Sequence, residues 1–386
     1  MIPVTSTLEP LTDTAAVADM VQRAGAGGGS VRIAGAGTWL DAGRPVHAPV
    51  VLSLGGLAGI VDYVPGDLTL TARAGTPLTE LARVTRAEGQ WLSLEPWGGD
   101  QGTLGATIAT ASAGPLAHAF GSPRDVVLGV EVVTGRGTVV RGGGRVVKNV
   151  AGYDLTRLMT GSWGTLGVIT EASVRLRGLP AVDETTALAL PRGGLAALEQ
   201  FLGGLRAVGI APIALELVSE ALARRLAIGA GALLLARLAG NEDTVAAQQS
   251  ALAALGDVAR VDGDVWHRLR TWEAAGAPLA RVSRAPAELA RTWQAAIALA
   301  DSDAALAHAT IGRGVVRCAA AESRLDSAHL ASLRNAGFTV IFERLPETSW
   351  PALALPTAGD HLSRGLRRVF DPGGVLNPGI LGVGAQ

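Results

Sequence analysis

Residues 102–114 read GTLGATIATASAG, a run of small and aliphatic residues without a charged side chain. Small residues let a backbone approach a bulky ligand closely, and the hydroxyls of Thr103, Thr107, Thr110 and Ser112 can hydrogen-bond it. A buried packing seam between two elements is the competing interpretation. The segment therefore indicates either a ligand-binding stretch or a close contact inside a core.

Two further glycine-rich segments lie in the same half of the chain. Residues 35–38 read GAGT after a predicted strand and can present backbone N–H groups to a phosphate. Residues 161–170 read GSWGTLGVIT and place three glycines before a β-branched strand, where main-chain groups can face a planar heterocycle. Each segment alone is also consistent with a tight turn or a bulged strand entry. Together the three segments favour one large cofactor.

The common nucleotide-binding motifs are absent. A Rossmann fingerprint needs a third glycine at position 40, which is Leu40, and no GxxxxGK[ST] sequence occurs. Between two of the glycine-rich segments lie Lys148, Asn149 and Tyr153, although the chain has one lysine, two tyrosines and four asparagines. A site that needs these side chains explains the clustering better than chance does.

Composition excludes several classes of function. Thirty-three basic and thirty-four acidic residues give a net charge of −1, which argues against a nucleic-acid binder. One cysteine, Cys318, excludes an internal disulfide and a cysteine-ligated zinc or iron–sulfur site held by this chain alone. Residues 1–22 lack the basic and apolar parts of a secretory signal, and the apolar run 228–236 is shorter than the roughly 20 residues of a membrane span. We therefore expect a soluble, intracellular protein.

Hydrophobic periodicity divides the chain near Pro180. The first part is expected to contain helices at 12–24 and 76–88, strands at 30–34, 50–54, 60–63, 68–73 and 168–176, and a hairpin of 126–134 with 139–141. The second part alternates helices at 194–208, 219–228, 242–255, 286–299 and 325–336 with strands at 213–217, 232–238, 279–283, 315–318 and 338–342. This alternation predicts a separate α+β domain with helices on one side of a sheet. No internal repeat is evident.

Five motifs in this order resemble one family: RIAGAGT (32–38), GTLGATIATASAG (102–114), GSPRDVVLGVEVVTGRG (121–137), KNVAGYDLTRLMTGSWGTLGVIT (148–170) and FDPGGVLNPG (370–379). The first four are similar to the FAD-binding domain of the vanillyl-alcohol-oxidase, or PCMH, type. The last resembles the closing motif of the lactate and glycolate dehydrogenase branch. Within that branch the chain is most similar to the FAD-binding subunits of glycolate oxidases.

The resemblance implies an α+β fold in three parts. A two-subdomain PCMH-type FAD-binding domain covers residues 1–178, an α+β ferredoxin-like cap covers 179–360, and a tail at 361–386 returns to the first domain. We expect FAD to be bound non-covalently, because no histidine lies in or beside the 35–38 loop. The cofactor contacts that the resemblance implies are Ala34, Gly35, Ala36, Gly37, Thr38, Trp39, Pro96, Trp97, Thr103, Gly105, Ala106, Ala109, Gly121, Ser122, Arg124, Gly164, Gly167, Val168, Ile169 and Asn377.

Two departures from the family matter. Members often have glutamate where this chain has Trp163, which puts a polar cofactor contact there in doubt. Catalytic relatives carry an HxGxGNxH-like motif, whereas residues 307–316 keep His308 without a second histidine. We therefore expect no metal site. His308 is a weak candidate for a catalytic base, with a structural role as the favoured alternative, and the other five histidines are interpreted as structural.

The favoured function is that of an FAD-binding redox subunit in a complex that oxidises glycolate, a 2-hydroxy acid, to glyoxylate. Its expected partners are a second flavin subunit and an iron–sulfur subunit. Arg313, Arg317 and Arg344 are candidates to bind the substrate carboxylate. The alternatives are a free-standing dehydrogenase for D-lactate or another 2-hydroxy acid, and a non-catalytic subunit that holds FAD or relays electrons. We expect a cytoplasmic location, with peripheral attachment to the inner membrane through partner subunits as a variant.

Overall fold

The computed structural model describes residues 7–144, 154–301 and 304–382. The described chain divides into two compact units. The first comprises residues up to Gly114, Gly121–Leu179 and the tail from Pro356. The second comprises Pro115–Phe120 and Pro180–Leu355. Within the described residues, no helix combines the length and the hydropathy that crossing a membrane requires.

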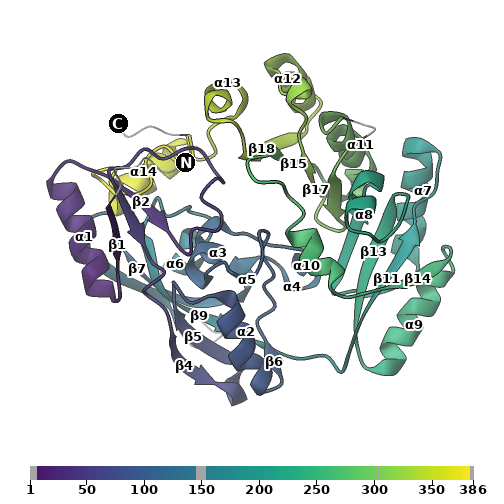
Figure 1. Cartoon of the computed structure of the whole chain (residues 1–386), viewed down its shortest axis with the longest axis horizontal. Helices are drawn as coiled ribbons and strands as arrows, with labels where there is room; N and C mark the ends of the chain where they lie inside the picture. Colours follow the sequence, from purple (N-terminus) through teal and green to yellow (C-terminus); the bar gives the residue numbers. More distant parts are fainter. Residues whose placement is uncertain (1–6, 145–153, 302–303, 383–386) are drawn as a thin grey trace. The chain divides into compact units, whose positions relative to one another are not determined.

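The first unit contains a small parallel sheet in the order β1 (Thr7–Pro10), β3 (Val50–Ser53) and β2 (Val31–Ala34) (Figure 1). Helix α1 (Thr14–Ala26) begins at Asp13, whose carboxylate accepts the backbone N–H of Ala16. It buries Val17, Met20 and Val21 in a cluster that also holds Leu52 of β3. An amphipathic helix needs such an apolar face, and its spacing was readable in the sequence.

A second sheet of the first unit is antiparallel and has the order β4 (Ile60–Val64), β5 (Thr69–Arg73), β9 (Val168–Arg175), β7 (Val127–Val133) and β8 (Val139–Gly143). Its core includes residues from α2 (Leu78–Ala87), α3 (Leu104–Thr110) and α6 (Leu155–Met159). The other described elements of this unit are the two-stranded pair β6 (Gln90–Trp91) with β10 (Arg177–Gly178), α5 (Pro123–Val126) and α14 (His361–Phe370). The two separate sheets agree with the expected two-subdomain architecture.

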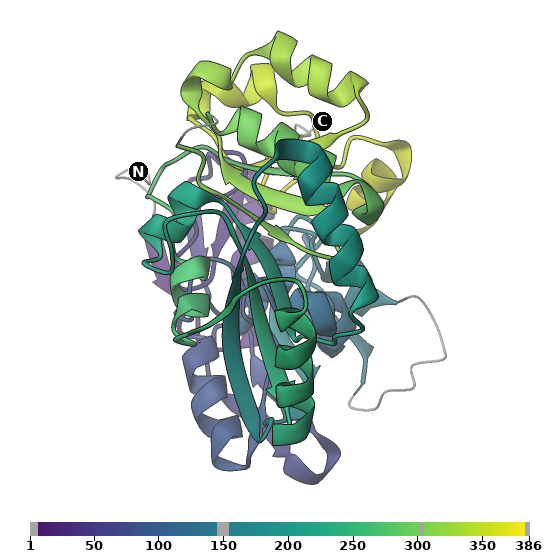
Figure 2. The same cartoon turned by 90° about the vertical axis from the view of Figure 1, so that its right-hand side faces the viewer.

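The second unit is built on one antiparallel sheet with the strand order β14-β11-β13-β12-β16-β17-β15-β18 among the described residues. Its first half runs β11 (Val182–Ala189), α7 (Gly194–Ala207), β12 (Ala214–Val218), α8 (Glu220–Arg225), β13 (Leu233–Gly240), α9 (Glu242–Ala253) and β14 (Val258–Val261). After α10 (Val265–Arg270), its second half runs β15 (Leu279–Ser283), α11 (Leu289–Leu299), β16 (Ala307–Thr310), β17 (Val315–Ala319), α12 (Ser327–Asn335) and β18 (Thr339–Arg344). Figure 2 shows helices running along the strands of this sheet.

Each half of this sheet places its strands in the order fourth, first, third, second, which is the ferredoxin-like arrangement. The two halves join where β12 pairs with β16. The expected ferredoxin-like cap is thus doubled. The expectation that the chain contains no internal repeat was wrong at the level of topology, because two sequences can build the same βαββαβ unit without sharing residues.

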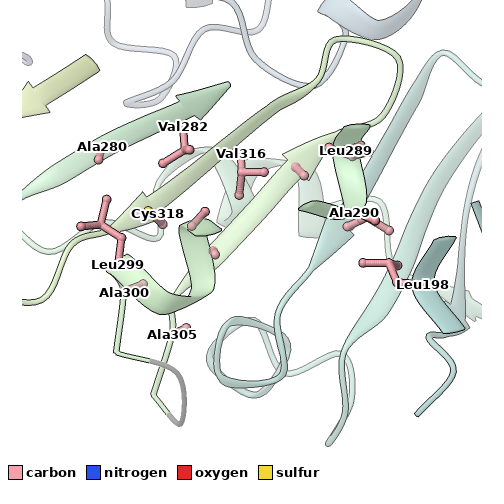
Figure 3. Packing of buried hydrophobic residues seen from close by; sticks show 14 of the residues in the cluster. Leu198, Ala280, Val282, Leu289, Ala290, Leu299, Ala300, Ala305, Val316 and Cys318 are labelled. Atoms are coloured by element: carbon pink, nitrogen blue, oxygen red, sulfur yellow. The ribbon is translucent and has the colours of Figure 1, made fainter. Parts of the chain in front are cut away.

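One face of the sheet carries the main core of the second unit. Val282 of β15 and Val316 of β17 pack with Leu289 and Leu299 of α11 and with Leu198 of α7 (Figure 3). The alternate residues of the same strands, such as Arg317, point to the other face. Strands β11, β14 and β16 and helices α10 and α3 were absent from the expected element list.

Candidate functional site

The first unit contains a cleft that is lined by residues of all three glycine-rich segments. Most of the predicted cofactor contacts line it: Ala34, Gly35, Ala36, Gly37, Thr38, Trp39, Pro96, Trp97, Gly105, Ala106, Ala109, Gly164, Gly167, Val168, Ile169 and Asn377. The described lining also contains Thr107, Thr110 and Ser112, whose hydroxyls the sequence suggested as hydrogen-bond partners of a ligand. The remaining lining residues were not singled out as contacts: Arg32, Ile33, Leu40, Leu54, Gly99, Gly102, Trp163 and Ile380. Of all these residues Arg32 alone carries a charge.

The loop after β2 presents backbone donors to the cleft. Gly37 has φ +77°, a conformation that glycine adopts without strain. A Cβ at Gly37 would come no closer than 3.7 Å, to Leu40 Cδ1, so the loop is open on that side. The backbone N–H groups of Ala36, Gly37 and Thr38 donate to no described residue. Three consecutive amide donors beside a cleft are suited to an anion such as a phosphate.

Within residues 102–114, Leu104–Thr110 form helix α3, where the sequence suggested only a close approach of small residues. Thr103 caps this helix, because its Oγ1 accepts the N–H of Ala106 at 3.4 Å. The N–H groups of Leu104 and Gly105 donate to the carbonyls of Thr76 and Ala74, at 3.0 and 2.8 Å. These first donors of α3 are therefore used inside the protein, whereas the donors of the 36–38 loop have no partner among the described residues.

The hydroxyls expected to bond a ligand are also engaged within the protein. Thr107 Oγ1 donates to the carbonyl of Thr103 at 3.0 Å, and Thr110 Oγ1 donates to that of Ala106 at 2.8 Å. Ser112 Oγ accepts the N–H of Trp97 at 3.2 Å. These bonds fix the wall of the cleft. The expectation that these hydroxyls bond a ligand stays a prediction.

Packing against neighbouring residues requires glycine at positions 35 and 105, which the sequence did not reveal. A Cβ at Gly35 would lie 2.4 Å from Thr103 Oγ1, and one at Gly105 would lie 2.6 Å from Ala74 Cβ. Real Cβ atoms do not approach so closely, so both glycines let the loop, α3 and β5 pack together. Their contribution to a cofactor site is the shape of the wall.

Tryptophan side chains form an aromatic part of the lining. The rings of Trp39 and Trp163 stack with centroids 6.3 Å apart and planes inclined by 22°. Trp163 has φ +53°, and its backbone N–H donates to the carbonyl of Ala109 at 2.8 Å. Gly43 leaves room for this indole, since a Cβ there would lie 2.8 Å from Trp163 Cζ3. The departure from the family at position 163 therefore replaces a polar side chain by an aromatic wall.

Asn377 joins two walls of the cleft. Its Oδ1 accepts the N–H of Ile33 at 2.8 Å, and its Nδ2 donates to the carbonyl of Trp163 at 2.8 Å. Its own N–H donates to the carbonyl of Val31 at 3.0 Å. The asparagine is 4% exposed and adopts φ +41°, a conformation for which asparagine is better suited than most residues. The tail thus contributes to the site by fixing β2 against the 161–164 turn.

Four predicted contacts lie outside the lining: Thr103, Gly121, Ser122 and Arg124. Ser122 and Asp125 form a capping box at α5, in which Asp125 Oδ2 accepts the Ser122 N–H at 2.8 Å. Gly121 has φ +80°, and a Cβ there would lie 2.5 Å from Asp125 Oδ2. The side chain of Arg124 is 61% exposed. In this structure the GSPRD turn is explained by helix capping.

The cluster of Lys148, Asn149 and Tyr153 lies outside the described residues, so its role stays a prediction.

His308 of the second unit lies on β16 and is 1% exposed. Its Nδ1 is 2.8 Å from Glu216 Oε2, and Thr310 Oγ1 donates to Glu216 Oε1 at 2.6 Å. The ring of Trp272 meets the imidazole edge-on at a centroid distance of 6.3 Å. A carboxylate that accepts from Nδ1 fixes the tautomer and the ring orientation of a histidine. The arrangement suits a positioned base and a buried structural histidine equally.

Two of the three candidate arginines are neutralised by carboxylates. Arg317 is 2% exposed and pairs with Glu273 and Glu343, while Arg344 Nη1 lies 2.7 Å from Glu273 Oε2. Burial alone would raise the pKa of Glu343, but the adjacent Arg317 and Arg281 hold that pKa below its ordinary value. These ion pairs leave Arg317 and Arg344 poorly suited to bind a substrate carboxylate.

Arg313, the third candidate, is exposed and its Nη1 donates to the carbonyl of Ala117 at 3.4 Å. In the described part of the chain, no group of three histidine, cysteine or acidic side chains is placed to hold a metal ion. Cys318 is buried, and burial raises the pKa of its thiol to about 12. Such a thiol is a core residue without nucleophilic character.

Comparison with known proteins agrees with the geometry of the cleft. A family model described as FAD binding domain matches residues 10–143. Glycolate oxidase subunit GlcE of Escherichia coli is 47% identical over 139 residues, which are 36% of this chain and 39% of that protein. Glycolate oxidase subunit GlcD of Bacillus subtilis is 35% identical over 187 residues, 48% of this chain and 39% of that protein. The chain thus spans about two fifths of the length of these curated relatives.

A solved structure of p-cresol methylhydroxylase with substrate bound matches 98% of this chain and 88% of its own, with a TM-score of 0.75 at 16% identity. An alkyldihydroxyacetonephosphate synthase matches 96% and 75%, with a TM-score of 0.71 at 17% identity. At such identities the likeness establishes the fold alone.

Proposed function

We propose that this chain, which carries a PCMH-type FAD-binding domain, is the FAD-holding redox subunit of a complex. The complex would oxidise glycolate to glyoxylate. Glycolate oxidase subunits are among the relatives that this chain resembles, over 139 and 187 residues, and the FAD binding domain model covers residues 10–143, which include much of the lining of the cleft. A second flavin subunit and an iron–sulfur subunit are the partners that we propose, with a cytoplasmic complex that attaches peripherally to the inner membrane.

The single observation that carries the proposal is the fit of the cleft to FAD. Its open amide donors at Ala36, Gly37 and Thr38 suit a pyrophosphate, and the indoles of Trp39 and Trp163 suit an aromatic ring system. No histidine lies among the described lining residues, which supports non-covalent binding. Bound FAD would supply the acceptor for the hydride from the 2-hydroxy carbon.

The residues of this chain would then manage the proton and the carboxylate. His308 is our candidate for the base, because Glu216 Oε2 lies 2.8 Å from its Nδ1 and would orient the imidazole. Arg313 is our candidate to bind the substrate carboxylate, because it has no acidic partner among the described residues. Glu216 would act as a positioning residue that fixes the His308 tautomer.

Reduction of the flavin by substrate tests this proposal and separates it from its alternatives. The chain is purified alone, loaded with FAD and mixed anaerobically with glycolate or D-lactate while flavin absorbance is followed. We expect slow or absent bleaching alone and rapid bleaching when a second flavin subunit and an iron–sulfur subunit are co-expressed. Rapid stoichiometric bleaching of the single chain would instead identify a free-standing dehydrogenase. Bleaching in the complex that is unchanged when this chain lacks FAD would identify a non-catalytic subunit.

The role of His308 is tested in the active assembly. His308→Gln should lower kcat by about 100-fold or more if the histidine is the base, and Glu216→Gln should shift the pH profile of kcat while leaving substrate binding unchanged. His361→Gln, at an exposed histidine of α14, is the matched control. Normal kcat in His308→Gln would leave the histidine a structural role.

A further inference from the structure

Arg32 occupies an unusual position at the cleft. Val31 of β2 is buried in the apolar cluster of the small parallel sheet, and the next residue, Arg32, points to the opposite face of the strand. Both Arg32 and Ala34 line the cleft. Arg32 Nη2 donates to the carbonyl of Leu40 at 3.4 Å, which holds the guanidinium against the loop that carries the open amide donors.

The positive charge of Arg32 is not balanced by a carboxylate in the part of the chain that the structure describes. Its Nη1 is buried and has no hydrogen-bond partner among the described residues, and no described carboxylate lies within 4.0 Å. Desolvation by burial lowers the pKa of this guanidinium. A cation that loses its water and gains no counter-charge destabilises a fold, so such residues are retained where an anion is bound.

We infer that Arg32 is the counter-cation of the FAD pyrophosphate and donates charge-assisted hydrogen bonds to a phosphate oxygen. This inference rests on the FAD binding of the proposed function. The fork of guanidinium donors matches phosphate geometry. Arg32 shares the loop with the donors of Ala36, Gly37 and Thr38, so one dianionic group satisfies the cation and the amides together.

The competing anion is the carboxylate of the substrate, and ligand binding distinguishes the two. ADP shares the pyrophosphate of FAD, whereas riboflavin shares only its flavin. Arg32→Met should raise the Kd of FAD and of ADP by about 10- to 150-fold, the factor expected for a lost hydrogen bond to a charged group. The Kd of riboflavin should change less than about threefold. Arg32→Lys, which keeps the charge without the fork, should recover part of the affinity for ADP.

The control is Arg83→Met, because Arg83 is on α2 with its side chain 73% exposed and does not line the cleft. It removes the same charge and should leave all three Kd values unchanged. Equal loss of FAD, ADP and riboflavin binding in Arg32→Met would show a structural effect and overturn the inference. Unchanged FAD and ADP binding with a raised KM for the 2-hydroxy acid would assign Arg32 to the substrate and would also overturn it.

Thermal unfolding gives a second readout that does not depend on catalysis. Removal of the half-buried Arg32 cation, which has no counter-charge among the described residues, should leave the Tm of the cofactor-free protein equal or higher in Arg32→Met, while the increase in Tm on adding ADP becomes smaller. A lower Tm without cofactor and an undiminished increase with ADP would show that Arg32 serves only to hold Leu40. Failure of the complex assembled with the second flavin subunit and the iron–sulfur subunit to oxidise a 2-hydroxy acid would refute the proposed function and leave these binding results standing.

Discussion

Replacement of Asn377 by alanine should loosen the cleft by a predictable amount. The change removes the acceptor of the Ile33 N–H and the donor to the Trp163 carbonyl, both at 2.8 Å and both part-buried. Each lost hydrogen bond costs about 1 kcal/mol, and alanine at φ +41° adds about 1 kcal/mol of backbone strain. The expected cost is therefore about 2–3 kcal/mol in the free energy that holds β2 to the 161–164 turn.

Hydrogen exchange of the amides of β2 measures this cost in the first unit, where a global unfolding curve would mix two units. A loss of about 2–3 kcal/mol corresponds to roughly 30- to 150-fold faster exchange through local opening. Asn377→Gly removes the same two bonds without the strain and should lie between the natural protein and Asn377→Ala. Asn335→Ala, at the exposed end of α12, is the control. Exchange at Ile33 that stays within threefold of the natural rate in Asn377→Ala would refute this account.

Three further outcomes follow from the structure. Acid precipitation of the loaded protein should release all of its flavin into the supernatant, and flavin retained in the pellet would contradict non-covalent binding. Gly37→Asp should weaken FAD binding by about tenfold or more relative to the neutral Gly37→Asn, because it adds a negative charge beside the proposed pyrophosphate position. Equal Kd values of FAD for the two variants would show that the loop does not contact the phosphates. Burial alone would raise the pKa of Glu131, but hydrogen bonds from Thr14, Thr170 and Arg141 together lower it. The ionised carboxylate therefore stabilises the fold above its pKa in the unfolded chain, and this stabilisation is lost as the pH falls through its pKa in the folded protein. Glu131→Gln should thus make the free energy of unfolding depend less on pH in the acid range, and an unchanged dependence would show that another carboxylate controls it.

The sequence predicted those elements whose periodicity is determined by one apolar face. Helix α1 and the hairpin of β7 and β8 were expected within two residues of their observed bounds at most of their ends. Strand β11 was missed because its residues, VDETTALA, are polar over the first half and alternate only over the second. Helix α3 was missed because glycine and threonine at 105, 107 and 110 have low helix propensity, and its packing against Ala74 outweighs that propensity.

The site was predictable where the backbone itself is the binding group. Glycine is visible in a sequence, and the resemblance of the ordered motifs led to the loop at 35–38, to α3 and to the strand at 167–169. Side-chain roles were harder to predict, since they depend on partners distant in sequence. Arg317 and Arg344 were candidates for a substrate carboxylate until the structure placed Glu273 and Glu343 beside them.

Arg32, in contrast, is a functional candidate that the sequence analysis did not identify, because it lies in the middle of a strand. Thirty-two of the thirty-three basic residues in this chain are arginines, so one more arginine gives no signal. Its distinction is the absence of a described counter-charge around a buried Nη1, which only a three-dimensional structure can reveal. Since a half-buried cation without a described counter-charge is costly in the free protein, we expect the stability of the cofactor-free first unit to rise when an anion binds in the cleft.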